Sequence, residues 1–199
     1  DVVSSTVPCS NKWMMGTVNS FFVGFIATFI ATTPGTLAAL GLSRPHMPYK
    51  GLIMAILISP MIVPLIITAA GMFFFYARIN LVYSFTGIIL AHVALATPFV
   101  VITVTATLVG FDMNMVKAAQ SLGARPVRTF FKVIMPLILP GVISGALFAF
   151  ITSFDEVVIV MFMGSLDQLT IPKQMWAGIR QEISPVILCM ATCLVILSI

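Results

Sequence analysis

Charged side chains are scarce in this sequence. Only 8% of its 199 residues are Asp, Glu, Lys or Arg, whereas 60% are hydrophobic and the mean hydropathy is +1.14. Soluble domains carry about a quarter charged residues, so this composition excludes an ordinary soluble domain. The net charge of +4 is small and lies between the apolar runs, which does not indicate a nucleic-acid partner. The chain is therefore expected to be a membrane protein.

The sequence also lacks the usual motifs of nucleotide binding, metal binding and catalysis. No stretch matches the phosphate-loop pattern GxxxxGKS/T, so the chain is not expected to bind ATP in that way. Its three cysteines form no disulfide framework, and His46 and His92 are too far apart in sequence to suggest a metal site. No nucleophile stands beside an obvious base. We therefore expect a chain that is not an enzyme and has no cofactor of its own.

Long apolar runs fill most of the chain. A bilayer core needs about 20 apolar residues per helix, and the runs suffice for about five spans. They are expected at residues 13–42, 51–76, 84–110 and 133–163, and from residue 185 onward. The predicted fold class is all-α, a polytopic transmembrane helical bundle. Residues 1–199 are taken as one transmembrane domain, and we expect a further span before Asp1.

Four prolines inside these runs are candidates for helix kinks. Pro60 and Pro64 lie one turn apart in SPMIVP and would free backbone carbonyls, which neighbouring helices or water in a cavity must satisfy. The alternative is a packing helix that is merely kinked. The other two candidates are Pro98 and Pro140.

The fourth apolar run is too long for one untilted span, so a break is expected near residues 153–155. Asp155 and Glu156 lie at this point, and each charge near the membrane centre costs about 2.5–3.5 kcal/mol on insertion scales. Adjacent residues on a helix point about 100° apart, so only one of the two is expected to line a pathway. Alternatively, hydrogen bonds or an ion pair made by these acids pin the bend or hold an outer gate closed.

Two further features concern helix packing. His92 lies inside the third run, where it is either a functional group or a hydrogen-bonding partner of a neighbouring helix. Gly141 and Gly145 have GxxxG spacing, which lets the fourth helix approach a neighbour closely.

A polar segment, residues 111–136, separates the third and fourth runs. Residues 114–122 favour helix, Gly123 can adopt the left-handed conformation that ends it, and Pro126 suits the first turn of the next helix. The positive-inside rule places this segment in the cytoplasm, because most of the loop cations are on its side of the membrane: Arg44, Lys50, Lys117, Arg125, Arg128 and Lys132. The segment is either a short helix that transmits force to the next span or an ordinary amphipathic connector.

A second polar segment covers residues 164–184. Thr170, followed by Ile171 and Pro172, resembles a helix start. A short surface helix that bears Trp176 and Arg180 is expected here.

The first polar segment resembles the signature loop of binding-protein-dependent ABC importer permeases. That signature reads Glu-Ala-Ala, three residues, Gly, nine residues, Ile, one residue, Leu-Pro. The spacing matches throughout at Lys117, Ala118, Ala119, Gly123, Val133, Met135 and Pro136. Val133 and Met135 are mild departures, whereas Lys117 reverses the charge of the signature's acidic residue and puts in doubt any ion pair made at that position.

The resemblance extends over nearly the whole chain, through TPGTLAALGLSR, SPMIVPLII, AHVALATPFVV and SFDEVVIVMFM. The stretch TIPKQMWAGIRQEISP is most similar to the second permease of spermidine/putrescine importers. The resemblance implies a permease in a bacterial inner membrane, working with a second permease, a pair of cytoplasmic ATPase subunits that bind ATP and Mg²⁺, and a periplasmic binding protein.

The resemblance also implies roles for residues. The stretch from Lys117 to Arg125, including Ala124, would be the coupling helix that sits in a cleft of the ATPase. Asp155, Glu156 and Trp176 would belong to the substrate path or its gate, where a carboxylate could bind an ammonium group of a polyamine weakly. Open alternatives are a different cargo (a phosphonate, an opine or an amino-acid derivative) or, from another class, an ion-coupled carrier or channel subunit that uses these acids and His92.

Overall fold

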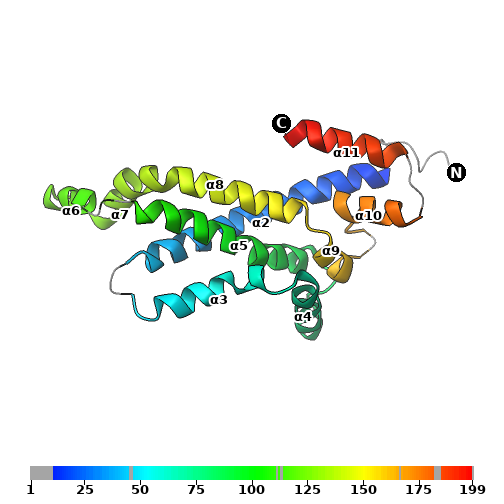
Figure 1. The fold of residues 1–199 in the computed structure, drawn as a ribbon, viewed down its shortest axis with the longest axis horizontal. Helices are drawn as coiled ribbons and strands as arrows, with labels where there is room; N and C mark the ends of the chain where they lie inside the picture. The colour runs from blue at the N-terminus through cyan, green and yellow to red at the C-terminus, as the bar shows by residue number, and fades with distance from the viewer. Residues whose placement is uncertain are drawn as a thin grey trace. The chain divides into compact units, whose positions relative to one another are not determined.

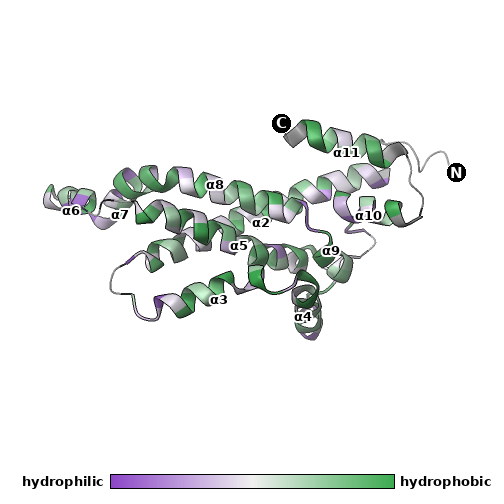
Figure 2. Ribbon diagram, viewed as in Figure 1, coloured by the Kyte–Doolittle hydropathy of each residue, from purple (hydrophilic) through white to green (hydrophobic). Residues whose placement is uncertain are grey.

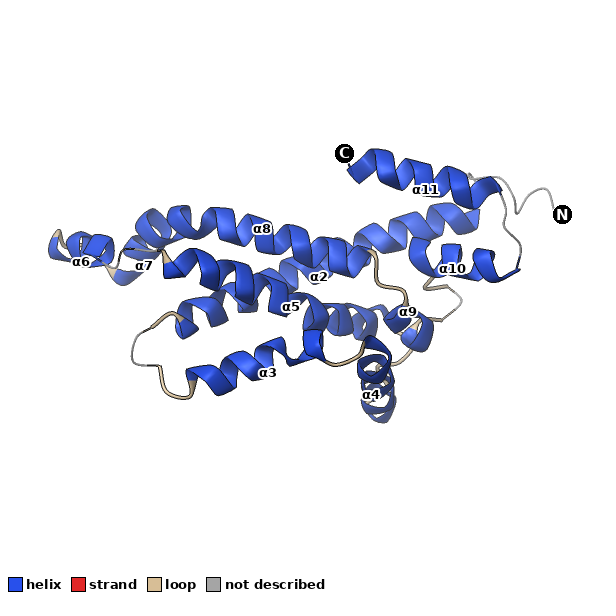
Figure 3. Ribbon diagram, viewed as in Figure 1, coloured by secondary structure: helices blue, strands red, loops and turns tan. Residues whose placement is uncertain are grey.

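The computed structural model describes residues 11–44, 47–110, 112, 114–165, 167–181 and 185–198. His46 and the side chain of Arg180 lie outside this description. Every secondary-structure element of the described residues is helical (Figure 3), which confirms the predicted all-α class.

The helices follow one another along the chain as coloured in Figure 1. Their bounds are α2 Asn11–Leu42, α3 Lys50–Ile62, α4 Leu65–Arg78, α5 Phe85–Val109, α6 Asn114–Ser121, α7 Pro126–Thr129, the π-helical turn η1 Phe130–Ile134, α8 Met135–Phe154, α9 Val158–Met163, α10 Ile171–Gln181 and α11 Pro185–Ser198.

Among the described residues, three helical stretches are long and apolar enough to cross a membrane: Lys12–Leu42, Phe85–Val109 and Pro126–Phe154. Taken as one span, α3 and α4 give a fourth, and α11 holds a shorter apolar stretch, Ile187–Ile196. Figure 2 shows apolar residues along most of α3, α5, α8 and α11, with hydrophilic residues gathered on α6. The expected number of about five spans is reached only when the broken pair and α11 are both counted.

The second apolar run differs from the single kinked helix expected. It is broken, because α3 ends at Ile62 and Val63 has an extended backbone with ψ 135°. Pro64 then caps α4, which begins at Leu65. Proline lacks an N–H and disfavours a helical conformation in the residue before it, which explains a break at Val63. Pro60, Pro98 and Pro140 instead lie inside α3, α5 and α8.

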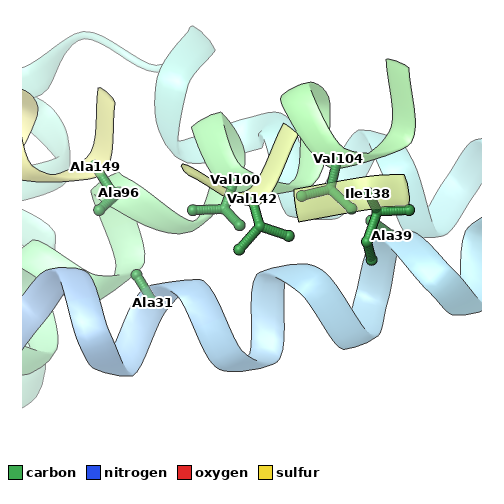
Figure 4. Packing of buried hydrophobic residues seen from close by; sticks show 8 residues of the cluster. All are labelled: Ala31, Ala39, Ala96, Val100, Val104, Ile138, Val142 and Ala149. Atoms are coloured by element: carbon green, nitrogen blue, oxygen red, sulfur yellow. The ribbon is translucent and has the colours of Figure 1, made fainter. Parts of the chain in front are cut away.

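The chain forms two compact units, and several long helices contribute to both. The first unit comprises residues 1–26, 64–92 and 153–199, and the second comprises 27–63 and 93–152. The core of the second unit is built from small and β-branched side chains of α2, α5 and α8 (Figure 4): Ala31, Ala39, Ala96, Val100, Val104, Ile138, Val142 and Ala149.

Glycines of α8 allow this close packing. A Cβ atom placed on Gly145 would lie 3.0 Å from the Cα of Val100, and one on Gly141 would overlap the Thr107 hydroxyl. Both neighbours belong to α5, so the GxxxG spacing marks a close contact between α8 and α5, as predicted.

Candidate functional site: coupling loop and acidic break

The loop between α5 and α8 begins with a short helix, as the sequence predicts. Asp112 Oδ1 accepts a hydrogen bond from the backbone N–H of Asn114 at 2.9 Å, which satisfies one of the free donors at the start of α6. At the other end Gly123 has φ +80°, the left-handed conformation expected of it. The Ala124 N–H donates to the Ala119 carbonyl at 3.0 Å and so closes the helix end.

The next helix starts immediately after this turn. Pro126 occupies the first turn of α7, where its missing N–H is not needed. From there the helical path continues through η1 into α8, where Pro136 is exposed. The π-helical turn has no recognisable signal in the sequence, because π turns have no strong residue preference and the apolar pattern only predicts a helix.

Helix α6 contains no buried residue. Lys117, Ala118 and Arg125 are exposed, while Ala119 and Ala124 are half-buried. Leu122 is 88% exposed at the tip of the loop. An apolar side chain this exposed in a loop between two membrane-spanning helices is a candidate for burial against a partner.

A cleft of about 550 Å³ lies beside the loop within the second unit. Residues from the ends of α2 and α5 line it, together with residues of α6, α7 and η1. Arg44, Val116, Gln120 and Phe130 are among them. Sequence reasoning did not predict this cleft, since its lining residues come from distant parts of the chain and share no motif. Because of this cleft, α6 is incompletely packed against the ends of α2 and α5.

The fourth apolar run breaks where predicted, since α8 ends at Phe154 and α9 begins at Val158. The two acids between them have different surroundings. Glu156 is only 7% exposed. Its Oε1 accepts hydrogen bonds from the backbone N–H groups of Val158 at 2.7 Å and Ile159 at 3.0 Å. Asp155, by contrast, is exposed. Glu156 therefore holds the start of α9, whereas Asp155 lies at the surface of the chain.

Lys173 of α10 holds the other end of α9. Its Nζ donates to the carbonyls of Val160 at 3.1 Å, Gly164 at 3.0 Å and Ser165 at 3.4 Å. Burial lowers the pKa of this ammonium group. A carboxylate at the N-terminus and a cation at the C-terminus both complement the helix dipole. No sequence pattern indicates this role, because Lys173 lies ten residues beyond α9 and contacts backbone atoms there.

The segment between α9 and α10 is tied to other helices of the first unit. The side-chain amide of Asn19 donates to the carbonyls of Asp167 at 3.2 Å and Leu169 at 2.9 Å. Gln168 Nε2 donates to the Tyr83 carbonyl at 3.0 Å. The peptide N–H of Tyr83 in turn donates to the carbonyl of Met163, the last residue of α9, at 2.9 Å. Side chains and backbone groups thus fix both ends of α9 and the loop that follows it.

The short surface helix predicted within residues 164–184 is present as α10, Ile171–Gln181, with Trp176 49% exposed. The cap differs from the one expected. The first N–H, that of Ile171, donates at 2.9 Å to the hydroxyl of Ser20 in α2, and the Thr170 hydroxyl is buried without a hydrogen-bond partner. A local cap can be predicted from sequence spacing, whereas a cap supplied from a residue 151 positions away cannot.

His92 takes the structural alternative considered for it. It is buried in α5, and its Nδ1 forms a hydrogen bond of 2.8 Å with the hydroxyl of Ser153 in α8. This contact links the third predicted span to the end of the fourth, next to the acidic break.

Comparison with known proteins agrees with this architecture. Residues 14–199 match the family described as binding-protein-dependent transport system inner membrane component. The chain is 31% identical to the spermidine/putrescine transport system permease protein PotC of Haemophilus influenzae, over 92% of this chain and 71% of that protein. It is 29% identical to the putrescine transport system permease protein PotI of Escherichia coli, over 90% of this chain and 66% of that protein.

A third relative is named for another cargo. The sulfoquinovosyl glycerol transport system permease protein SmoH of Agrobacterium fabrum is 28% identical, over 80% of this chain and 57% of that protein. The chain thus spans between 57% and 71% of the lengths of these three relatives. Because the family match covers residues 14–199, the chain belongs to the inner-membrane permease components of binding-protein-dependent ABC importers.

Proposed function

We propose that this chain forms part of the translocation path for a polyamine, such as spermidine or putrescine, in an ATP-driven importer. The observation that carries this proposal is the similarity to a spermidine/putrescine permease over 92% of the chain. The exposed carboxylate of Asp155, at a break in an apolar helix, agrees with a cationic cargo.

Asp155 is the acid that we assign to the cargo. Glu156 already accepts two backbone hydrogen bonds, so its carboxylate is committed to the start of α9. An exposed carboxylate and an ammonium group about 4 Å apart attract each other by about 1 kcal/mol in water. An interaction of this size guides a cation without trapping it, as transport requires. The exposed ring of Trp176 is a second candidate contact, through a cation–π interaction.

The loop of residues 111–136, here called the coupling loop, supports the proposal that the importer is driven by ATP. If the importer is ATP-driven, separate subunits must bind ATP and Mg²⁺, because no phosphate loop is recognisable in this chain. We assign Lys117, Ala118, Ala119, Gly123 and the residues up to Arg125 to the contact with such an ATPase, because α6 contains no buried residue and Lys117 and Ala118 are exposed. A second permease and a periplasmic binding protein complete the proposed assembly.

A different cargo remains the second candidate, because one relative is named for sulfoquinovosyl glycerol. The deciding experiment is ATP hydrolysis by the complete assembly in lipid nanodiscs, with its binding protein. The cargo panel contains spermidine, putrescine, sulfoquinovosyl glycerol, a phosphonate, an opine and an amino-acid derivative.

Polyamines alone should stimulate hydrolysis, and Asp155→Asn should raise the polyamine concentration needed by about fivefold, the equivalent of about 1 kcal/mol. Lys50→Gln, which removes an exposed charge at the start of α3, is the control. Stimulation by another panel member would overturn the cargo. Uptake that continues without ATP but stops when the ion gradient collapses would overturn the importer.

A further inference from the structure

The coupling loop carries charge of almost one sign. Residues 111–136 contain four cations and a single acid, Asp112. That carboxylate already accepts a hydrogen bond from the start of its own helix. The cations are all exposed: Lys117, Arg125, Arg128 and Lys132. The surface offered to the cytoplasm by this loop is therefore basic, with the apolar tip of Leu122 beside it.

Lys117 lies in the middle of this surface. It is the fourth residue of α6, next to Ala118, and both side chains are exposed. The methyl side chain of Ala118 projects only a short distance from the helix, so an opposing protein surface can approach Lys117 closely. The loop signature has an acidic residue at this place, so the charge that its partner meets here is reversed.

We propose that the ATPase partner presents a carboxylate to the Nζ of Lys117, in a cleft that also buries Leu122. This inference rests on the proposed function, and it specifies the partner further. An ATPase whose cleft places a cation at this point would be repelled by Lys117. Charge complementarity of this kind selects partners chiefly by excluding wrong ones. The loop therefore restricts the chain to ATPases with an acidic cleft.

A lipid surface is the competing partner for a basic loop, because the cytoplasmic leaflet is negatively charged. The compact geometry favours a protein. The left-handed turn at Gly123 and the following Pro126 fix the direction of α6, and the exposed alanine permits close contact. Attraction to lipid headgroups needs neither feature.

The test is zero-length cross-linking of the purified complete assembly with a water-soluble carbodiimide, which joins an amine to a carboxylate only when the two are in contact. Mass spectrometry should find Lys117 joined to an Asp or Glu of the ATPase. Lys117→Arg keeps the charge and should keep cargo-stimulated ATP hydrolysis, while losing the cross-link. Lys117→Glu should lower that hydrolysis at least about tenfold. Lys50→Glu, the same charge change at another exposed cytoplasmic position, should leave it unchanged.

The outcomes separate this inference from the proposed function. An assembly that hydrolyses ATP in response to cargo, yet tolerates Lys117→Glu, would overturn the charge contact and leave the importer intact. Cross-linking of Lys117 to phosphatidylserine instead of the ATPase would assign the loop to the membrane surface and likewise overturn the contact. A chain that assembles with no ATPase would refute the proposed function and this inference together.

Discussion

Replacement of the two acids at the end of α8 should separate a structural role from a transport role. In Glu156→Ala, the N–H groups of Val158 and Ile159 lose the oxygen that accepts from both. An unsatisfied buried donor costs about 1–3 kcal/mol, and the favourable charge at the helix start is worth about 0.3–1 kcal/mol. Partial access of water to the Val158 N–H reduces the sum, and we expect a loss of about 3 kcal/mol.

The assay is thermal unfolding of the purified assembly, combined with spermidine-dependent uptake into liposomes. About 3 kcal/mol corresponds to a fall in melting temperature of about 6–12 °C for a chain of this size. Glu156→Gln keeps an oxygen acceptor and should lose only about 1 kcal/mol. Asp155→Asn changes an exposed side chain and should alter stability by less than about 0.5 kcal/mol.

Uptake should show the opposite ranking. Asp155→Asn should raise the apparent KM for spermidine about fivefold, whereas Glu156→Gln should leave it near that of the wild type. The reasoning would be refuted if Glu156→Gln abolished spermidine dependence at unchanged melting temperature while Asp155→Asn had no effect. That result would show that the buried carboxylate, and not the exposed one, meets the cargo.

Gly123→Val places a β-branched residue at φ +80°, so it should cost at least about 1–2 kcal/mol locally and uncouple ATP hydrolysis from uptake. Gly123→Asn is the control, because asparagine tolerates this conformation and should retain coupling. Wild-type uptake by the valine variant would contradict the role of the turn. Gly145→Val should destabilise the assembly by about 1–3 kcal/mol in thermal unfolding, because its Cβ would meet α5. Gly71→Val is the matched control, since a Cβ at Gly71 meets nothing within 4 Å. Equal losses of stability in the two variants would argue against the close contact between α8 and α5. Lys173→Met keeps the length of the side chain but removes three donated hydrogen bonds. Thermal unfolding should therefore show a loss of stability of about 1–2 kcal/mol. An unchanged melting temperature would show that α9 does not need this cation.

The sequence predicted most of the helices because their signals are local. Apolar runs gave α2, α5 and α8 within a few residues, and the small-residue stretch with Gly123 and Pro126 gave α6, its end and the next start. The break after Phe154 was also predictable, since an apolar run of that length cannot stay straight in one bilayer. The main error in the helices was at Val63 and Pro64, where a kink was predicted and the structure has a break.

The candidate site was predicted only in part, because several of its contacts join distant segments. The acidic pair was recognised because charges in an apolar run are energetically costly. Which of Asp155 and Glu156 is buried and which is exposed depends on which carboxylate reaches the start of α9. The contact of Lys173 with α9 and that of Ser20 with α10 follow from how the helices of the first unit lie side by side. No spacing rule along the chain contains that information.

The charges at the two ends of α9 have a consequence for how this region can evolve. Glu156 and Lys173 contact the peptide backbone, whose donors and acceptors face fixed directions along the chain. Exchanging the two charges would set a cation against N–H donors and an anion against carbonyl oxygens. In an ion pair, reversing both charges restores the attraction, but here both contacts would become repulsive. Related sequences that keep either cap should therefore keep the sign of that residue, whatever happens to the other. A search for compensating charge reversals would overlook this pair, although the two side chains hold the same helix.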